Sequence, residues 1–288
     1  MRLSILYKGQ FGLFIRRGLY KLLQWFSHCY PISPSATKID VIIPLVEKDL
    51  HILPLCLEGI RKNVLHTIDS IYIVAPKSKK IKTFCDDNQL IYINENQVLG
   101  YGAQDVNFIT DDGTNRSGWI FQQLLKLSAS IGKNPYYLVI DADHILLKPH
   151  VFITQKEKYV FYQSLECHLP YYYNIQSILG YFPSTFLSYV THKMIFNRKD
   201  VIEMQKRIEE RHSGKWDTII INSLDKNEKS PFSEYELFGS YIPYKRKILL
   251  PWKQITLKYT DIDSFVNLQV KYPNYMSATF PEWFSTNT

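Results

Sequence analysis

The sequence predicts an α/β protein in which helices flank a mostly parallel β-sheet within a single continuous domain. From residue 38 onward, short runs of β-branched and aromatic residues alternate with segments of helical period. Such alternation is typical of parallel strands that are joined by helices. The composition is globular, with 45% apolar and 21% charged residues, which is too apolar for a disordered chain. A chain of 288 residues can bury a core large enough to fold without disulfide bonds.

The expected elements follow one another in a regular order in the first half of the chain. Runs of Val, Ile and Tyr predict the strands, the apolar period predicts the helices, and Ser78 is a candidate helix N-cap. Strands are expected at 39–46, 70–76, 90–94 and 136–140, and helices at 50–64, 78–86 and 116–131. The second half is less regular, with strands expected at 159–164 and 191–197 and helices at 200–211, 216–224 and 233–241. No change of composition divides it, so we expect one domain over residues 36–288.

Residues 1–35 are expected to form a basic amphipathic helix and a linker. One face of the helix is apolar, with Phe11, Phe14, Ile15, Leu19, Leu22 and Phe26. The other face is polar and basic, with Arg16, Arg17, Lys21 and Gln24. This pattern fits a helix that lies at a membrane surface, with residues 1–30 as the contact. It fits equally a helix packed on the domain with its basic side in water, and the prolines within 31–35 then end it.

Charge and cysteine spacing exclude several classes of protein. The net charge of +7 comes mainly from residues 1–30, so no basic stripe predicts nucleic-acid binding. No window offers the roughly 20 charge-free apolar residues of a membrane span. Two arginines interrupt the apolar N-terminal stretch, so no secretory signal is expected. The four cysteines are far apart and predict neither a zinc site nor a disulfide framework, which favours a cytoplasmic location, with the inner membrane surface as a peripheral site.

Two acidic residues, Asp141 and Asp143, directly follow the buried strand expected at 136–140. A buried strand holds the loop that follows it in a fixed place. Two carboxylates two residues apart can bind one hard divalent cation, which keeps further positions open for phosphate oxygens. Such a cation neutralises charge on a departing diphosphate. The same spacing also occurs in ordinary turns and helix caps, so the pair alone leaves both interpretations open.

Four stretches in order along the chain resemble a bacterial family of glycosyltransferases with the GT-A fold, which is Rossmann-like. They are GWIFQQLLKL (Gly118–Leu127), YYLVIDADHILLKP (Tyr136–Pro149), THKMIFN (Thr191–Asn197) and SEYELFG (Ser233–Gly239). The resemblance spans residues 38–244. It implies a GT-A-like domain that moves a sugar from a UDP- or GDP-sugar donor to a hydroxyl of a glycan or lipid-linked acceptor, in the synthesis of an envelope or surface polysaccharide.

The resemblance also implies roles for particular residues. Mn²⁺ or Mg²⁺ would be held by Asp143, secondarily by Asp141, and by His192 in place of the late histidine that many such enzymes use. A lone histidine is also common as a structural residue. Contacts to the donor are expected from Pro44, Glu47, Glu95, Gln122, Gln123, Lys126 and Asp141. Glu95 fits an exposed turn equally well, Lys126 could meet a phosphate as a point charge, and Trp119 is assigned to the core.

Glu234 and Glu236 are the candidates for a catalytic base that takes the proton of the acceptor hydroxyl. Ser233 and Glu236 also match a capping box, which would leave Glu234 freer to act, and a retaining enzyme would need no such base. An aromatic loop is expected to bind the acceptor, or else to fill the core. It contains Tyr171, Tyr172, Tyr173, Tyr181 and Phe182.

Two other functions compete with sugar transfer. A haloacid-dehalogenase-like phosphatase would use the Asp141 and Asp143 pair, but its nucleophile should follow the first strand, and three expected strands precede this one. A non-enzymatic module that binds a membrane surface would explain the basic helix but not the four ordered stretches. The sequence therefore favours a metal-dependent glycosyltransferase.

Overall fold

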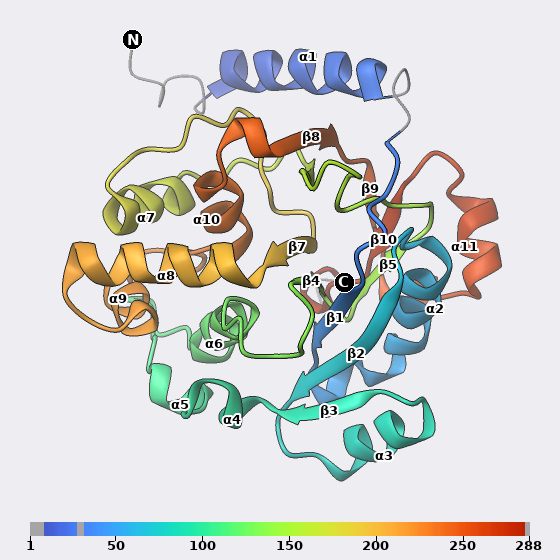
Figure 1. Ribbon diagram of the computed structural model, residues 1–288, viewed down its shortest axis with the longest axis horizontal. Coiled ribbons are helices and arrows are strands. Elements are labelled where there is room, and N and C mark those ends of the chain that lie inside the picture. The colour runs from blue at the N-terminus through green and yellow to red at the C-terminus, as the bar shows by residue number, and fades with distance from the viewer. Residues whose placement is uncertain (1–8, 28–31, 286–288) are drawn as a thin grey trace.

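A five-stranded sheet forms the centre of the molecule, in the order β3-β2-β1-β4-β7 (Figure 1). This computed structural model describes residues 9–27 and 32–285. The strands are β1 (Ile39–Pro44), β2 (Ile68–Ala75), β3 (Ile91–Asn94), β4 (Tyr136–Ile140) and β7 (Lys193–Asn197). The first four are parallel, and β7 pairs antiparallel with β4. The predicted mixed α/β architecture with a mostly parallel sheet is confirmed.

Helices connect the strands and cover the sheet. They are α2 (Leu53–Asn63), α3 (Lys79–Asp87), α4 (Glu95–Leu99), α5 (Ala103–Val106), α6 (Ser117–Lys126), α7 (Leu169–Leu179), α8 (Arg198–His212), α9 (Trp216–Asn222), α10 (Glu234–Tyr241), α11 (Phe265–Lys271) and α12 (Glu282–Ser285). In Figure 1, α6, α8 and α10 lie on one side of the sheet, and α2 and α11 lie on the other. Short 3₁₀ turns occur at Glu47–His51, Tyr244–Arg246 and Tyr259–Asp261.

Two small sheets extend the centre and were not expected from the sequence. One contains β5 (His144–Leu146), β10 (Ser277–Thr279) and β9 (Gln254–Thr256), with β10 in the middle. The other pairs β6 (Tyr159–Gln163) with β8 (Lys247–Pro251). The turn that contains Asp141 and Asp143, here called the acidic turn, leads directly into β5. Because β5 starts one residue after Asp143, its pairing with β10 fixes the far side of this turn.

The core lies between the central sheet and its helices. The strands β1 and β4 are buried along their whole length, as their runs of apolar residues predict. On α2, the absence of a side chain at Gly59 allows close packing against β5. A Cβ there would lie 2.9 Å from backbone atoms of Leu146. Each Leu or Ile side chain that is moved out of water in this core contributes roughly 1.5–3 kcal/mol.

Several expected elements are shorter or different in the structure. The helix expected at 116–131 ends at Lys126, because the backbone at Ala129 is left-handed, with φ 54°. The helix expected at 50–64 is a 3₁₀ turn followed by α2. The expected aromatic loop is wrong for Tyr171, Tyr172 and Tyr173, which lie in α7, whose first turn contains Pro170. Tyr181 and Phe182 follow this helix in a loop. The N-cap prediction is confirmed, since Ser78 Oγ accepts a hydrogen bond from Ile81 N.

The N-terminal helix α1 (Gly9–Ser27) lies along one edge of the molecule beside β8 (Figure 1). It turns Arg16 toward the body, where this side chain is only 7% exposed. Aromatic side chains point away from the body, with Phe14 74% and Trp25 65% exposed. The sequence interpretation placed Arg16 on the side of the helix that faces water, and this is wrong because Arg16 is buried. The side chain of Phe26 and the residues 1–8 and 28–31 lie outside the described part of the chain.

None of the helices within residues 9–27 and 32–285 is both long enough and apolar enough to cross a membrane.

A buried carboxylate at the start of β1 ties three segments together. Asp40 is fully buried, and its Oδ2 accepts hydrogen bonds from the backbone N of Lys133 at 2.8 Å and of Asn134 at 2.9 Å. Arg198 at the start of α8 pairs with the same oxygen at 3.1 Å. The loop between α6 and β4 and the start of α8 are thus held to β1.

We expect Asp40→Ala to lower the free energy of unfolding by about 3–5 kcal/mol, because it leaves Arg198 and two backbone donors without their partner. Urea denaturation measures the change. Glu58→Ala is the control, since it removes an exposed pair with Lys62 on α2 and should cost about 0.5 kcal/mol or less. Equal losses for the two variants would contradict the structural role of Asp40.

Candidate active site

A cleft of about 700 Å³ opens beside the carboxyl end of β4, a size that suits a small-molecule site. One wall is the face of α6 that carries Trp119, Gln122, Gln123 and Lys126. Opposite walls come from the start of α10, the segment before β7 and the C-terminal residues Pro281 and Trp283. Open sheets of this kind bind ligands at the carboxyl ends of their strands, which is where the cleft lies.

Lys126 is the centre of a buried network at the base of this cleft. Its Nζ lies 2.7 Å from Asp141 Oδ1 and 2.7 Å from Glu234 Oε1. The residue is only 4% exposed. Burial opposes a charge on the lysine, but the two carboxylates outweigh it and raise the pKa of Lys126 above its ordinary value. The lysine is therefore charged and neutralises acids of the protein itself.

Asp141 is bound on both of its oxygens. Besides Lys126, Tyr235 donates from its hydroxyl to Oδ1 at 3.2 Å, and His192 Nδ1 lies 3.0 Å from Oδ2. Burial tends to raise the pKa of Asp141, but Lys126 and His192 hold it below its ordinary range. Conversely, burial opposes a charge on His192, yet Asp141 raises the pKa of this imidazole. The structure thus brings together Asp141 and His192, two of the residues that were expected to hold a cation.

His192 reaches Asp141 from a strained backbone position. Its φ is 61°, which is left-handed and uncommon for residues with a side chain. Its backbone is held on the same side, because Asp141 N donates to His192 O at 2.9 Å. A strained residue that is fixed this firmly at the mouth of a cleft is typical of a functional position.

Asp143 differs from Asp141 because it forms no ion pair with any described residue. Its side chain is half-buried, and burial, with help from Asp141 and Asp49, raises the pKa of Asp143 to about 6. Its carbonyl accepts a hydrogen bond from Phe280 N at 3.0 Å, next to β10. It does not line the cleft itself. This carboxylate is the part of the acidic turn whose charge is least compensated by the protein.

The donor chemistry of this end of β4 fits a divalent cation, although the side chains are not gathered around one point. Within the described residues, no three His, Cys, Asp or Glu side chains converge closely enough to hold an ion. The oxygens of Asp143 lack an ion partner, and the Nε2 of His192 has no hydrogen bond to a described residue. Asp141 Oδ1 already accepts two hydrogen bonds, whereas its Oδ2 has one partner and keeps capacity for a further contact. Carboxylate oxygens are the donors that suit Mn²⁺ or Mg²⁺.

The structure brings some of the other predicted residues to the cleft. Gln122, Gln123 and Glu234 all line it. Gln123 Oε1 accepts from Glu234 N at 3.3 Å, and the alternative orientation of this amide would donate to Glu234 Oε2 at 2.7 Å. Burial raises the pKa of Glu234, with Lys126 acting against it. Tyr171, from the expected aromatic set, also lines the cleft.

Glu236 is turned away from the cleft. Residues two apart on a helix do not share a face, so Glu234 and Glu236 on α10 point in different directions. The carboxylate of Glu236 accepts bonds from Ser188 Oγ and from Tyr189 N, the latter at 3.0 Å. It is fully buried, and burial raises its pKa to about 8. Only the N-cap part of the expected capping box forms: Ser233 Oγ accepts from Glu236 N, while the carboxylate of Glu236 bonds to Ser188 and Tyr189 instead of to Ser233 N.

Three residues that were expected to contact the donor lie outside the cleft. Pro44 is buried as the last residue of β1. Glu47 bonds instead to Ser78 at 2.8 Å and to Lys80 at 2.6 Å on the surface. Glu95 starts α4 and is half-buried. None of the three is among the residues that line the cleft.

Trp119 is the clearest residue that the sequence interpretation missed. It packs against the core, as expected, but it also lines the cleft, and Arg116 stacks on its ring with the guanidinium 4.3 Å from the ring centroid. Trp119, Gln122, Gln123 and Lys126 are spaced as neighbours on one helix face. That spacing is visible in the sequence and could have placed Trp119 with them.

The chain belongs to a protein family described as a family of unknown function (DUF6492), which matches residues 36–279. No curated protein matches the sequence.

Among solved structures, the fold is similar to that of several glycosyltransferases. The galactosyltransferase LgtC, solved with donor and acceptor sugar analogs, is 10% identical, with 84% of this chain and 87% of that chain covered and a TM-score of 0.42. The bifunctional glycosyltransferase WbbM is 12% identical, with 85% and 46% covered and a TM-score of 0.47. Glucosyl-3-phosphoglycerate synthase from Mycobacterium tuberculosis, solved with Mn²⁺ and UDP, is 11% identical, with 81% and 73% covered and a TM-score of 0.35.

We expect Lys126→Met to lower the free energy of unfolding by about 3–5 kcal/mol at pH 8, because two buried carboxylates lose their cation. In the native protein the pKa of Asp141 lies below its value in the unfolded chain. The ionised carboxylate therefore stabilises the fold above the unfolded pKa, and this stability is lost as the pH falls. Without Lys126 the buried acids favour their protonated forms, so they penalise folding as the pH rises.

The loss caused by Lys126→Met should therefore be smaller at pH 5 than at pH 8, as measured by urea denaturation at the two values. Lys62→Met serves as the control, because Lys62 pairs with Glu58 on the exposed side of α2. A loss that does not change with pH would contradict the role of Lys126 as counter-ion to the two acids.

Proposed function

We propose that the protein is a glycosyltransferase that moves a sugar from a nucleotide-sugar donor to a hydroxyl group of a glycan or lipid-linked acceptor. The single observation that carries the proposal is the acidic turn at the tip of β4, where Asp141 is neutralised by the protein but Asp143 is not. A carboxylate of this kind beside a cleft is suited to a cation that accompanies a diphosphate. The four sequence stretches that resemble GT-A enzymes support the same activity.

Mn²⁺ or Mg²⁺ would be held by Asp143, Asp141 and His192. When bound, such an ion supplies positive charge that lowers the energy of the departing diphosphate. The residues of the chain have separate tasks. Lys126 fixes the carboxylate of Asp141 through an ion pair. The strained backbone at His192 keeps its imidazole beside Asp141. Positioning of this kind accounts for much of the catalysis in group transfer.

Glu234 is the residue that we propose as the base in an inverting reaction. It lines the cleft, whereas Glu236 does not. Burial raises the pKa of Glu234, and a raised pKa improves a carboxylate as a proton acceptor near neutral pH. The ammonium group of Lys126, 2.7 Å away, keeps it ionised before the acceptor arrives. In this scheme the acceptor hydroxyl gives its proton to Glu234 as its oxygen attacks the anomeric carbon.

We expect Asp143→Asn to reduce diphosphate release from the accepted nucleotide sugar by about a hundredfold or more, because the change removes one negative charge at the cation site. A panel of UDP- and GDP-sugars with Mn²⁺ measures this activity. Titration of Mn²⁺, followed by electron paramagnetic resonance, gives a second readout that does not depend on turnover.

Asp111→Asn is the matched control, because Asp111 is exposed and lies outside the cleft. It should leave both activity and Mn²⁺ binding unchanged. The proposal fails if native protein releases no diphosphate from any donor of the panel, or if Asp143→Asn matches native protein in both measurements.

We also propose that α1 contacts an anionic phospholipid surface, which would bring the enzyme to a lipid-linked acceptor at the cytoplasmic side of a membrane. Its outward side carries Phe11, Phe14, Leu22 and Trp25, which are 67%, 74%, 52% and 65% exposed. Arg17 and Lys21 on the same helix are also exposed. Phe11, Phe14 and Arg17 line a shallow hollow. Aromatic and cationic side chains that share an exposed helix surface suit the boundary between headgroups and acyl chains.

We expect the double change Phe14→Ser and Trp25→Ser to weaken vesicle binding at least about tenfold, since each ring gives up roughly 1.5–3 kcal/mol of burial. Co-sedimentation of the full chain with phosphatidylglycerol vesicles measures the effect, and phosphatidylcholine vesicles test the charge contribution. Tyr244→Ser, which removes another exposed aromatic ring, should bind as native protein does. Equal binding by all variants would contradict the membrane contact.

A further inference from the structure

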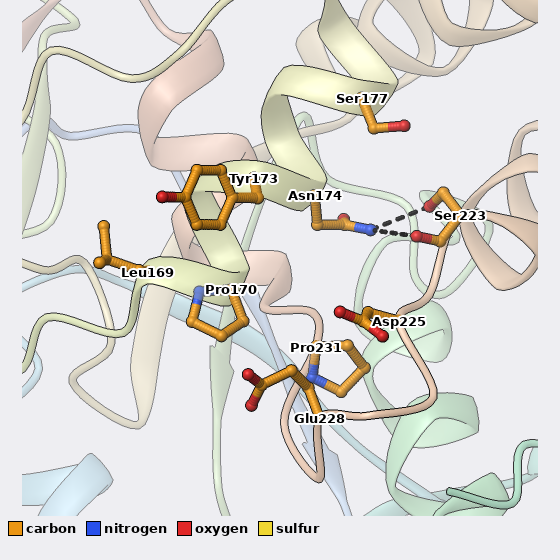
Figure 2. A pocket seen from close by; sticks show the side chains of 9 residues that line it. All are labelled: Leu169, Pro170, Tyr173, Asn174, Ser177, Ser223, Asp225, Glu228 and Pro231. Carbon is orange, nitrogen blue, oxygen red and sulfur yellow. Dashed lines mark hydrogen bonds between the residues drawn. The ribbon is translucent and has the colours of Figure 1, made fainter. Parts of the chain in front are cut away.

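A second pocket of about 420 Å³ lies beside the cleft, between α7 and the segment that joins α9 to α10 (Figure 2). In Figure 2 the side chains of α7 form one side, among them Pro170, Tyr173 and Asn174. The joining segment forms the other side and contributes Asp225 and Glu228. Of the residues that line this pocket, only Tyr173 was among the candidates named from the sequence.

The two hollows share their walls. Along the start of α7, Pro170 and Tyr173 line the second pocket, whereas Tyr171 lines the cleft. Along the joining segment, Glu228 lines the second pocket, whereas Lys229 lines the cleft. The cleft and the second pocket therefore lie on either side of the same two segments.

The shared wall is a fixed structure. His168 Nε2 lies 2.8 Å from Ser230 O, which joins the start of α7 to the segment before α10. Asn174 Nδ2 donates to Ser223 Oγ at 2.9 Å and to Ser223 O at 3.3 Å, which joins the same two parts on the far side of the pocket. The pocket is therefore held open by bonds between its walls, and a ligand would meet a preformed site.

The lining of the second pocket suits a sugar ring. Tyr173 is 49% exposed, and its ring can cover the apolar face of a pyranose. The carboxylates of Asp225 and Glu228 form no ion pair with a described residue. Asp225 Oδ1 already accepts from Asn227 N at 2.9 Å and from Asn227 Nδ2 at 3.0 Å, so Asp225 Oδ2 and the carboxylate of Glu228 are the oxygens that can accept charge-assisted hydrogen bonds from sugar hydroxyls. Asn174 is 5% exposed, and its Oδ1 has no hydrogen-bond partner among the described residues.

The charge of the pocket favours the acceptor substrate over the nucleotide-sugar donor. Its lining contains two acidic side chains and no basic one. Phosphate groups would be repelled there, whereas neutral hydroxyl groups would not. The diphosphate of a nucleotide sugar therefore belongs to the cleft, and the second pocket is left for a part of the substrate that carries no phosphate.

We propose that this pocket is a subsite that binds a neutral hexopyranose of the acceptor glycan, one or more residues away from the sugar whose hydroxyl reacts in the cleft. The role of the subsite rests on the proposed function. The ability of the pocket to bind a sugar does not depend on the proposed function, because the pocket contains none of the residues assigned to the donor or to the cation.

Saturation-transfer NMR on the full chain tests the subsite without any donor. The probes are the methyl glycosides of glucose, galactose, mannose, rhamnose, N-acetylglucosamine and N-acetylgalactosamine. We expect saturation of at least one of them, and binding about tenfold weaker in Tyr173→Ala, since the aromatic contact is lost. Glu228→Gln keeps the shape of the side chain and should also weaken binding, which keeps the test decisive if Tyr173→Ala does not fold.

The matched control is Tyr244→Ala, because Tyr244 is 53% exposed and lies outside this pocket. It should bind the glycoside as native protein does. Saturation of none of the glycosides, or equal saturation in native protein, Tyr173→Ala and Glu228→Gln, would overturn the subsite. Glycoside binding by a protein that releases no diphosphate from any nucleotide sugar would overturn the proposed function instead, and would leave the sugar pocket standing.

Discussion

The ammonium group of Lys126 is the constraint on which the arrangement of the site depends. It joins its own helix, α6, to Asp141 at the end of β4 and to Glu234 at the start of α10, each at 2.7 Å. Because Lys126 and Glu234 are buried and Asp141 is partly buried, a charge on any one of them is costly without its partners. The bond therefore sets where α10 begins relative to the sheet. It follows that Tyr235 lies over Asp141 and that Glu236 points away from the cleft.

Much of the central sheet could be predicted because β1, β2 and β4 are runs rich in β-branched and aromatic residues. β1 and β4 are buried throughout, and β2 is buried in its second half. The small sheets could not be predicted in this way. The strands β5, β9 and β10 have three residues each, too few for a period to be visible. The helix at 116–131 was extended too far because apolar spacing continues to Ile131, while the chain has already turned at Ala129.

From the sequence one could name some of the residues that line the cleft, such as Gln122, Gln123, Lys126 and Glu234, but not the network that joins them. Lys126 was expected to meet a phosphate, yet its partners are acids 15 and 108 residues away in the chain, and no local pattern shows such a pairing. The choice between Glu234 and Glu236 depends on the first residue of α10, which sequence alone places poorly. The exposure of Trp119 depends on the distant residues that form the opposite wall of the cleft.

The pairing of β5 with β10 has a consequence for how the molecule folds. The turn that contains Asp141 and Asp143 is closed on one side by β5, and β5 is hydrogen-bonded to residues 277–279 near the other end of the chain. Contacts between segments so distant in sequence form late, because a long loop must close first. A partly folded chain can therefore contain β1, β2 and β4 before its acidic turn is closed. The same pairing makes the order of this turn sensitive to any unravelling that begins at β10.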